Sequence, residues 1–244
     1  MDARRVYRDW VGGQGLVTFT VALGETDLLV AAPHDLSREA LASAARHRAA
    51  IESYIRSHPR FATSLQPIEA RTHAPDIAKG MARAAAAAGV GPLAAVAGAI
   101  AEAVGLDLLQ LTDEVIIENG GDIFLSTRSR RTVGLYAGRS ALTGKLALVL
   151  EPEDTPLGIC TSSGSFGHSL SFGAADACTV LARPAALADA VATSLANRIR
   201  TASDLAAALT ASAIPEGVSG VVATIDGQVA VWGRVRLTPI EAGR

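Results

Sequence analysis

Residues 118–123 are the part of the sequence that constrains the fold most. The segment reads Glu118-Asn119-Gly120-Gly121-Asp122-Ile123 and joins two apolar runs, 115–117 and 123–125. An Asn-Gly pair between apolar runs is a strong signal for a β-hairpin. The adjacent glycines also leave the backbone bare between two acids, so a ligand or a metal could approach the main chain closely. The segment alone predicts a hairpin turn, with a binding loop as the alternative.

The other strand-like runs also follow one another through short turns, and helical segments are interspersed among them. This order predicts an α+β fold with a largely antiparallel sheet, in one domain that spans residues 1–244. Ser37 is expected to cap the first helix. We expect strands at about 17–21, 27–31, 115–118, 122–126, 132–137, 145–150, 157–161, 177–182, 218–225 and 228–235, and helices at about 37–57, 76–88, 93–104 and 184–200.

Composition narrows the class of protein and its partners. Apolar residues make up 49% of the 244 residues and charged residues 19%, which is typical of a globular chain with a sizeable core. The net charge of −2 provides no broad basic surface, so nucleic acid is not an expected partner. Cys160 and Cys178 show neither a metal spacing nor a disulfide framework, which fits a reducing cytoplasm.

Two further features of the sequence bear on the cellular location of the protein. No apolar signal core follows Met1, so we expect a cytoplasmic protein without a secretion signal. The uncharged run 84–101 reaches the lower limit of a membrane span, but Gly89-Val90-Gly91-Pro92 interrupts it. The interruption predicts two short helices of small residues packed closely in a core, and no membrane partner.

The predicted helix that begins at Pro184 contains one charged residue before Asn197, which is Asp189. Such a helix is expected to be buried on most of its surface, where a lone carboxylate is costly unless it is paired, hydrogen-bonded or bound to a metal. Thr193 lies four residues further, on the same face. The two side chains supply hard oxygen ligands that suit Mg²⁺ shared with substrate phosphates. Alternatively, Asp189 interacts favourably with the positive N-terminal end of the helix dipole, or it forms an ion pair with Arg183.

Residues 161–171 contain six hydroxyl side chains, two glycines and a histidine. Such a loop can hold phosphate through backbone N–H groups and hydroxyls. It could also supply a serine nucleophile, Ser163 or Ser165, with His168 as the base and Asp176 as its orienter. The segment lacks the G-x-S-x-G elbow, and an ordinary loop is the third interpretation.

The segment 89–92 precedes a predicted helix, with Pro92 as the first helical residue. Free N–H groups at a helix start attract anions, including phosphate, so Gly91 is a candidate contact for a phosphorylated ligand. A plain turn between two helices, without a ligand, is the alternative.

Several of these motifs resemble the ApbE-like superfamily, whose best-known members are Mg²⁺-dependent FAD:protein FMN transferases. The segment 119–122 resembles the family's N-x-G-G-D segment after a strand. The segment 188–193 is similar to its A-D-A-x-x-T motif, whose acid and hydroxyl bind the metal, which implies that Asp189 and Thr193 are metal ligands. Residues 161–164 look like the T-S-G that precedes the family's histidine segment, which implies that His168 belongs to it.

The chain most resembles an ApbE-like branch labelled thiamine-biosynthesis-like, through segments 25–28, 89–92, 96–102 and 161–176. This resemblance covers most of the chain and implies the ApbE-like α+β fold, with small-residue helices packed on the sheet. Two segments depart from the transferases. Ala97 stands at the position of the lysine in their G-x-x-K-G segment, and residues 169–173 replace their D-P-x-T-G. The metal pair is kept, whereas parts of the flavin-contacting frame are not.

The residues and the resemblance together predict a protein that binds a small phosphorylated ligand, such as FAD, with Mg²⁺. If it transfers FMN, the metal polarises a pyrophosphate and a hydroxyl of an acceptor protein attacks phosphorus. Two alternatives stay open: a non-catalytic flavin or nucleotide-binding protein, and a serine hydrolase that uses the 161–168 loop. The expected ligand contacts are Asn119, Gly120, Gly121, Asp122, Gly91, Thr161, Ser162, Ser163, Gly164 and His168.

Overall fold

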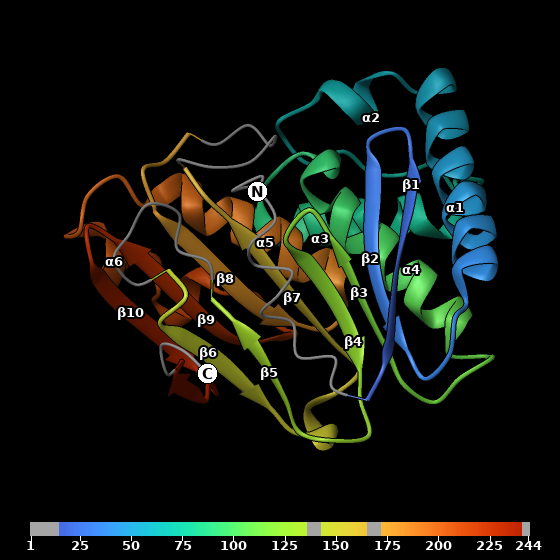
Figure 1. The fold of residues 1–244 in the computed structure, drawn as a ribbon. Helices are drawn as coiled ribbons and strands as arrows, with labels where there is room; N and C mark the ends of the chain where they lie inside the picture. The colour runs from blue at the N-terminus through green and yellow to red at the C-terminus, as the bar shows by residue number, and fades with distance from the viewer. Residues whose placement is uncertain (1–14, 136–142, 165–171, 241–244) are drawn as a thin grey trace.

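The computed structural model describes residues 15–135, 143–164 and 172–240. Its largest element is an eight-stranded sheet in the order β1-β2-β3-β4-β7-β8-β9-β10, in which all neighbouring strands run antiparallel (Figure 1). The antiparallel sheet predicted from the short turns is therefore confirmed. The strands are β1 (Val17–Leu23), β2 (Thr26–Ala32), β3 (Val115–Asn119), β4 (Asp122–Ser126), β7 (Leu157–Ser162), β8 (Ala177–Ala182), β9 (Val218–Ile225) and β10 (Gln228–Gly233).

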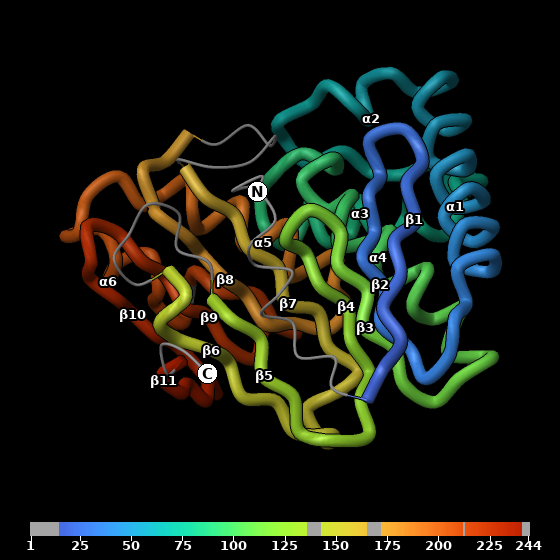
Figure 2. Tube along the Cα trace, viewed as in Figure 1, coloured from blue at the N-terminus to red at the C-terminus, as the bar shows by residue number. Residues whose placement is uncertain are grey.

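A second, three-stranded antiparallel sheet lies on one face of the large one. Its order is β11 (Leu237–Pro239), β6 (Leu146–Leu150) and β5 (Arg131–Gly134). Leu148 and Leu150 of this sheet share a buried apolar cluster with Ile116 and Leu125 of the large one. Figure 2 shows the β1–β2 hairpin at one edge of the large sheet and the β9–β10 hairpin at the other.

Helices cover the opposite face of the large sheet (Figure 1). The central pair, α4 and α5, packs against strands β3, β4, β7 and β8, and α3 packs on α5. Alanines and glycines allow this close approach, because few aromatic side chains are present to fill space. At Gly105 of α4, for example, an added Cβ would lie 2.2 Å from the ring of Phe124. The helices are α1 (Ser37–Ser57), α2 (Arg60–Thr63), α3 (Asp76–Ala88), α4 (Val96–Leu108), α5 (Ala185–Arg198) and α6 (Asp204–Ala208), with 3₁₀ turns η2 (Pro92–Ala95), η3 (Pro152–Asp154) and η4 (Ala211–Ala213).

The hairpin predicted at residues 118–123 is confirmed. Strands β3 and β4 pair with Asn119 opposite Asp122, which leaves a two-residue turn. Its two glycines have φ angles of 65° at Gly120 and 105° at Gly121. A two-residue hairpin that needs positive φ at both central positions favours glycine there, because only glycine adopts such angles without strain.

Some predicted boundaries and one predicted cap were wrong. Ser37 does not cap α1; it is the first helical residue, and its N–H donates to Oδ1 of Asp35 at 2.8 Å. The helix expected from residue 93 is a 3₁₀ turn that begins at Pro92, followed by α4, which continues to Leu108. Carboxylate acceptors compete well with hydroxyls for exposed N–H groups at helix starts, and a sequence pattern does not reveal which one lies in reach.

The interruption predicted within the uncharged run 84–101 is also present. Segments Asp76–Ala88 and Pro92–Leu108 meet at an angle of 104°. Within the described residues, no single helix has both the length and the apolarity that a membrane crossing requires, and this bent pair meets that test only when its two parts are added together.

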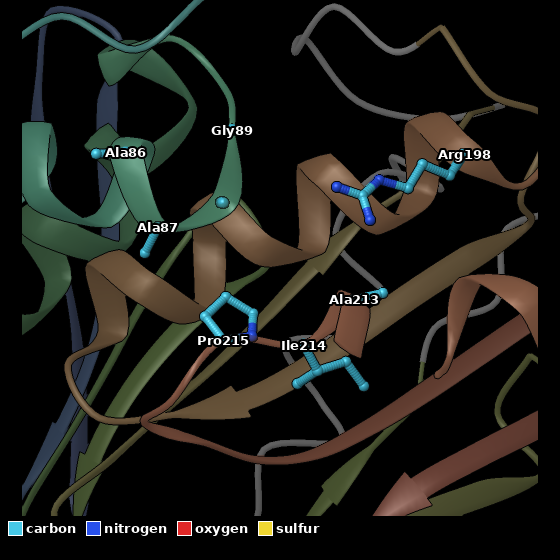
Figure 3. Close-up of a pocket in the computed structure, with 8 residues that line it drawn as sticks. Ala86, Ala87, Gly89, Arg198, Ala213, Ile214 and Pro215 are labelled. Carbon is cyan, nitrogen blue, oxygen red and sulfur yellow. The ribbon is translucent and has the colours of Figure 1, made fainter. Parts of the chain in front are cut away.

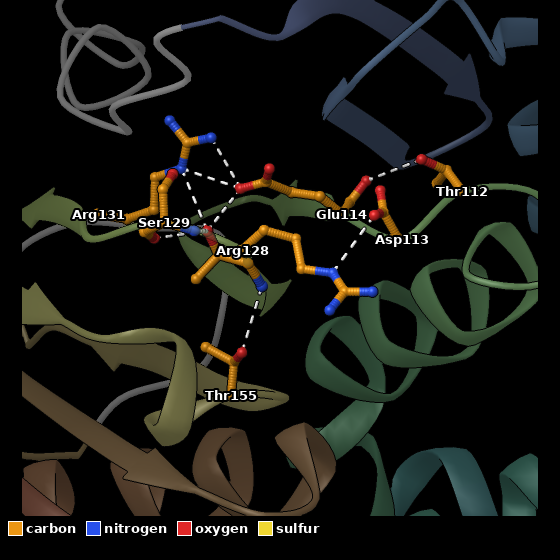
Figure 4. A network of polar contacts seen from close by, with 8 residues as sticks. Thr112, Asp113, Glu114, Arg128, Ser129, Arg131 and Thr155 are labelled. Atoms are coloured by element: carbon orange, nitrogen blue, oxygen red, sulfur yellow. Dashed lines mark hydrogen bonds and ion pairs between the residues drawn. The ribbon is translucent and has the colours of Figure 1, made fainter.

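A buried ion pair connects the two sheets (Figure 4). Nη2 of Arg131, at the start of β5, lies 2.7 Å from Oε1 of Glu114, just before β3. The hydroxyl of Thr127 donates to the same carboxylate oxygen at 2.5 Å, and its N–H donates to Thr155 Oγ1 at 3.2 Å. Burial acts to raise the pKa of Glu114, but the hydrogen bonds from Thr127 and Arg131 bring it below its ordinary value. The carboxylate therefore stays ionised and holds β5 against the large sheet.

Candidate functional site

Two acids from distant parts of the chain lie close enough to interact at one end of the large sheet. Asp122 is the first residue of β4 and is 9% exposed, whereas Asp189 lies in the second turn of α5 and is partly exposed. Burial raises the pKa of Asp122 well above its ordinary value, and the charges of Asp189 and Glu118 raise it further. Like charges that approach each other in a low dielectric disfavour joint ionisation, so a cation between the two carboxylates would favour the ionised form of both.

The start of α4 positions Asp189. Its Oδ2 accepts the N–H of Gly98 at 2.9 Å. A Cβ at Gly98 would lie 2.6 Å from the carbonyl oxygen of Ala185, so glycine permits α4 and α5 to approach this closely. Burial raises the pKa of Asp189 to about 7, while the N–H groups of Gly98 and Ala97 act in the opposite direction.

A second contact of the same kind lies one helical turn away. Oε2 of Glu102, in α4, accepts the N–H of Ala185 at the start of α5, at 3.0 Å. Each helix thus binds a first-turn N–H of its neighbour through a carboxylate, which satisfies a donor that has no partner inside its own helix. Sequence reasoning did not single out Glu102; burial raises its pKa, and it holds the start of the helix that carries Asp189.

Hydrogen bonds tie the residues on either side of the glycine turn to the start of α4 and to β7. Nδ2 of Asn119 donates to the carbonyl of Ala97 at 3.0 Å, and Oδ1 of Asp122 accepts the N–H of Thr161 at 3.2 Å. Within the turn, the N–H of Gly121 donates to Oε1 of Glu118 at 2.7 Å. The predicted residues Asn119, Asp122, Thr161 and Asp189 are therefore brought together around the start of α4, and Gly120 and Gly121 form the turn beside them.

Cys160 lies close to Asp122 and Asp189, and the sequence did not identify it as a site residue. It is fully buried in β7, and its Sγ lies 3.5 Å from the carbonyl oxygen of Ala185. Burial raises the pKa of its thiol, and the charges of Asp122 and Asp189 raise it further. The thiol is therefore neutral, and it donates to the carbonyl oxygen of Ala185. Its position directly before Thr161 was the only signal in the sequence.

The predicted hydroxyl-rich segment is described only up to Gly164. Ser162 and Ser163 are buried, and the hydroxyl of Ser163 donates to the backbone carbonyl of Asp176 at 2.7 Å. His168 and Ser165 lie outside the described residues, so the nucleophile–base pair stays a prediction. The hydrogen bond found at Ser163 ties this segment to the start of β8.

Thr193 and Gly91 differ in their access to solvent. Thr193 lies one turn after Asp189 on α5, is partly exposed, and has no hydrogen bond from its hydroxyl within the described ranges. Gly91 is buried, and a Cβ there would lie 1.8 Å from the carbonyl oxygen of Ser64. Its lack of a side chain thus serves contact with the connector after α2.

Apart from the neutral thiol of Cys160, the potential metal ligands near Asp189 are oxygen atoms. Across residues 15–135, 143–164 and 172–240, no three His, Cys, Asp or Glu side chains gather closely enough to bind a metal by themselves. Among the ion pairs found in those ranges, none involves Asp122 or Asp189. A hard cation here would therefore combine carboxylate oxygens with a hydroxyl, backbone carbonyls or ligand phosphates, a donor set that suits Mg²⁺.

An open pocket of about 290 Å³ lies elsewhere, between the last turn of α3 and the end of α5 (Figure 3). Among the described residues that line it, Arg198 has the only charged side chain, and the others are Ala86, Ala87, Ala88, Gly89, Ala213, Ile214 and Pro215. None of these is a predicted site residue. The convergence of acids, backbone donors and a free hydroxyl at α4 and α5 defines the candidate site better than the volume of this pocket.

The antiparallel sheet, its helical face and the Asn-Gly-Gly-Asp turn beside Asp189 define an ApbE-like protein. The sequence model of the family described as AbpE bacteria matches residues 8–226, and the chain belongs to this family. A "UPF0280 protein" of Methanosphaerula palustris is 42% identical over 224 residues, which are 89% of this chain and 88% of the relative. Another, from Methanospirillum hungatei, is 43% identical over 87% of this chain and 86% of its own.

A solved structure supports the fold. The apo form of the flavinyl transferase ApbE from Pseudomonas stutzeri superimposes with a TM-score of 0.50, over 89% of this chain and 93% of that chain, at 14% sequence identity. The ApbE-like fold expected from the sequence motifs is thereby confirmed.

Proposed function

We propose that this protein binds a flavin nucleotide, such as FAD, together with Mg²⁺ held by Asp189 and Thr193, and that it transfers the FMN part to an acceptor protein. The carrying observation is the pair of acids, Asp122 and Asp189, which interact with each other and have no ion-pair partner among the described residues. Membership of the family and the fold shared with a flavinyl transferase support the class of ligand.

The residues present fit Mg²⁺. Asp189 offers a carboxylate whose charge is disfavoured by burial, so a cation relieves a cost that is already present. Thr193 offers a free hydroxyl one turn away on the same helix, and Asp122 adds a second carboxylate. When bound, the metal supplies a Lewis acid that neutralises charge on a pyrophosphate.

The protein's own groups orient the ligand. The turn at Gly120 and Gly121 presents bare backbone, and its tethers to Ala97 and Thr161 keep it in place. A rigid, preorganised frame is the main contribution that a protein makes to phosphoryl transfer, because the reaction depends on positioning and charge stabilisation. Ser162 and Ser163 support this frame from the end of β7.

A non-catalytic flavin or nucleotide carrier is the second candidate, and Ala97 favours it. Ala97 is partly exposed beside Asp189, at the position where the resemblance places a lysine. A methyl group provides no positive charge for a phosphate, so Mg²⁺ carries more of the neutralisation here. A carrier has to bind its ligand but stabilises no transition state, so it does not need the positive charge that a lysine would supply.

Calorimetry tests the metal site. FAD is titrated into the wild type, Asp189→Asn and Thr193→Val, with Mg²⁺ or with EDTA. We expect Mg²⁺-dependent binding by the wild type and loss of the metal dependence in both variants. Asp113→Asn, which changes an exposed acid paired with Arg128, is the matched control and should bind as the wild type does. Equal affinity of Asp189→Asn and wild type would sink the proposed site.

Mass spectrometry separates the two candidates. Acceptor proteins incubated with the wild type, FAD and Mg²⁺ gain a covalently attached FMN if the protein is a transferase, with release of AMP. Tight FAD binding without any adduct, in acceptors that a known flavin transferase does modify, assigns the carrier role.

A further inference from the structure

Helix α5 exposes one narrow stripe in an otherwise buried surface. From Ala185 to Ala196 every side chain is buried except Asp189 and Thr193, and the next partly exposed residue is Asn197. These three polar residues are spaced by four, so they follow one face of the helix. The stripe begins at the proposed metal ligands and ends about 12 Å further along the helix axis.

The end of this stripe holds a separate segment of chain, residues 172–174, in place. The side-chain oxygen of Asn197 accepts the N–H of Phe172 at 2.8 Å. The N–H of Ala174 donates to the carbonyl of Ile199 at 2.8 Å. A Cβ on Gly173 would lie 1.9 Å from the carbonyl oxygen of Ala196, so this backbone rests directly on the end of α5.

The side chain of Phe172 is nevertheless left in solvent. It is 58% exposed, whereas Phe61 and Phe124 are buried and Phe19 packs against the core. Within the described residues, it is the only Phe, Tyr or Trp ring among the strongly exposed apolar side chains. One exposed apolar residue needs no explanation by itself, but a ring on an anchored backbone next to a polar binding stripe does.

We propose that Phe172 is the stacking surface for the planar aromatic ring of a ligand whose phosphates lie at Asp189 and Thr193. This inference rests on the proposed function and specifies its ligand as a phosphate joined to a ring through a sugar or sugar-alcohol linker. Thr193 and Asn197 are about 6 Å apart along the axis, a separation that such a linker spans. Stacking on an aromatic side chain tolerates different rings, because each has a π-face.

Binding measurements with three Mg²⁺-loaded ligands test the proposal. Pyrophosphate lacks a ring, ADP carries adenine and FMN carries the flavin ring. We expect Phe172→Ala to weaken the binding of at least one ring-bearing ligand by about tenfold or more, and to leave pyrophosphate unchanged. Phe172→Tyr, which keeps a ring, should restore the affinity. ADP and FMN together identify which ring stacks.

Leu111→Ala provides a matched control, because Leu111 is 54% exposed and follows the far end of α4. It should bind all three ligands as the wild type does. The proposal is overturned if Phe172→Ala binds ADP and FMN as tightly as the wild type, if it loses pyrophosphate equally, or if neither ring-bearing ligand binds more tightly than pyrophosphate.

The outcomes distinguish this inference from the metal site. Ring-dependent binding that falls in Phe172→Ala but does not respond to Mg²⁺ or to Asp189→Asn supports stacking and contradicts the metal site. The reverse pattern, sensitivity to Asp189→Asn with none to Phe172→Ala, supports the metal site and contradicts stacking.

Discussion

Replacement of Asp189 by Asn should stabilise the metal-free protein at high pH while it removes a carboxylate of the proposed metal site. Burial raises the pKa of Asp189 from 3.8 to about 7. Each pKa unit corresponds to about 1.4 kcal/mol, so ionising this group in the folded protein costs up to about 4 kcal/mol relative to the unfolded chain. Because Asp189 is partly exposed, we expect a measured gain of about 2–4 kcal/mol in Asp189→Asn at pH 8.

The direction of this change in stability with pH follows from the number of protons that the folded and unfolded states bind. Between about pH 4 and pH 7 the unfolded chain releases the Asp189 proton while the folded protein keeps it, so this group makes the stability of the wild type fall as pH rises. Above about pH 7 both states are ionised and the loss is complete. Asn cannot ionise, and its side-chain oxygen still accepts the N–H of Gly98. The variant should therefore lack this part of the pH dependence and should match the wild type most closely near pH 4.

Urea denaturation with EDTA at pH 5, 6, 7 and 8 measures the effect. In a second series at pH 8, Mg²⁺ with FAD should raise the stability of the wild type but not of Asp189→Asn, because a ligand stabilises only the state that binds it. A metal-free Asp189→Asn protein that is less stable than the wild type at pH 8 would contradict the reasoning. It would mean that the hydrogen bond to Gly98 outweighs the burial of charge.

Two further substitutions test the packing around the site. Gly98→Ala should destabilise the fold by about 1–3 kcal/mol in chemical denaturation, because its methyl group enters the contact between α4 and α5. Gly80→Ala, at a position in α3 with no atom near the added Cβ, should instead stabilise by about 1 kcal/mol; equal effects would refute the packing argument. Arg131→Met should cost about 3–5 kcal/mol, because Glu114 loses its buried partner. Arg130→Met, which breaks an exposed pair, should cost below about 1 kcal/mol, and a similar loss in both would contradict the distinction.

Local signals predicted much of the fold. The Asn-Gly turn with apolar flanks identified the β3–β4 hairpin, and the bounds predicted for α1, α3, β8 and β9 agree with the structure. The small sheet was not predictable in the same way. Its third strand, Leu237–Pro239, pairs with Leu146–Leu150 across about ninety residues, and neither segment carries a signal for the other.

The candidate site was likewise predictable where it depends on local sequence and not where it depends on distant contacts. The spacing of Asp189 and Thr193 placed both on one helix face, and between Ala185 and Ala196 they are the two partly exposed positions of α5. The proximity of Asp122 to Asp189 depends on the order of the strands, which local patterns do not encode. Glu102 and Cys160 were missed because both act through contacts with Ala185, which lies in a distant part of the chain that local patterns do not connect to them.

The contacts around Asp189 join four segments that are far apart in the chain, at residues 97–98, 119–122, 160–161 and 185–189. Contacts of such long range form late in folding, because each must close a large loop of chain before it stabilises anything. A partly folded chain that lacks β7 or α5 therefore lacks the proposed ligand site. A ligand bound at the proposed site would therefore stabilise the completely folded protein without trapping its folding intermediates.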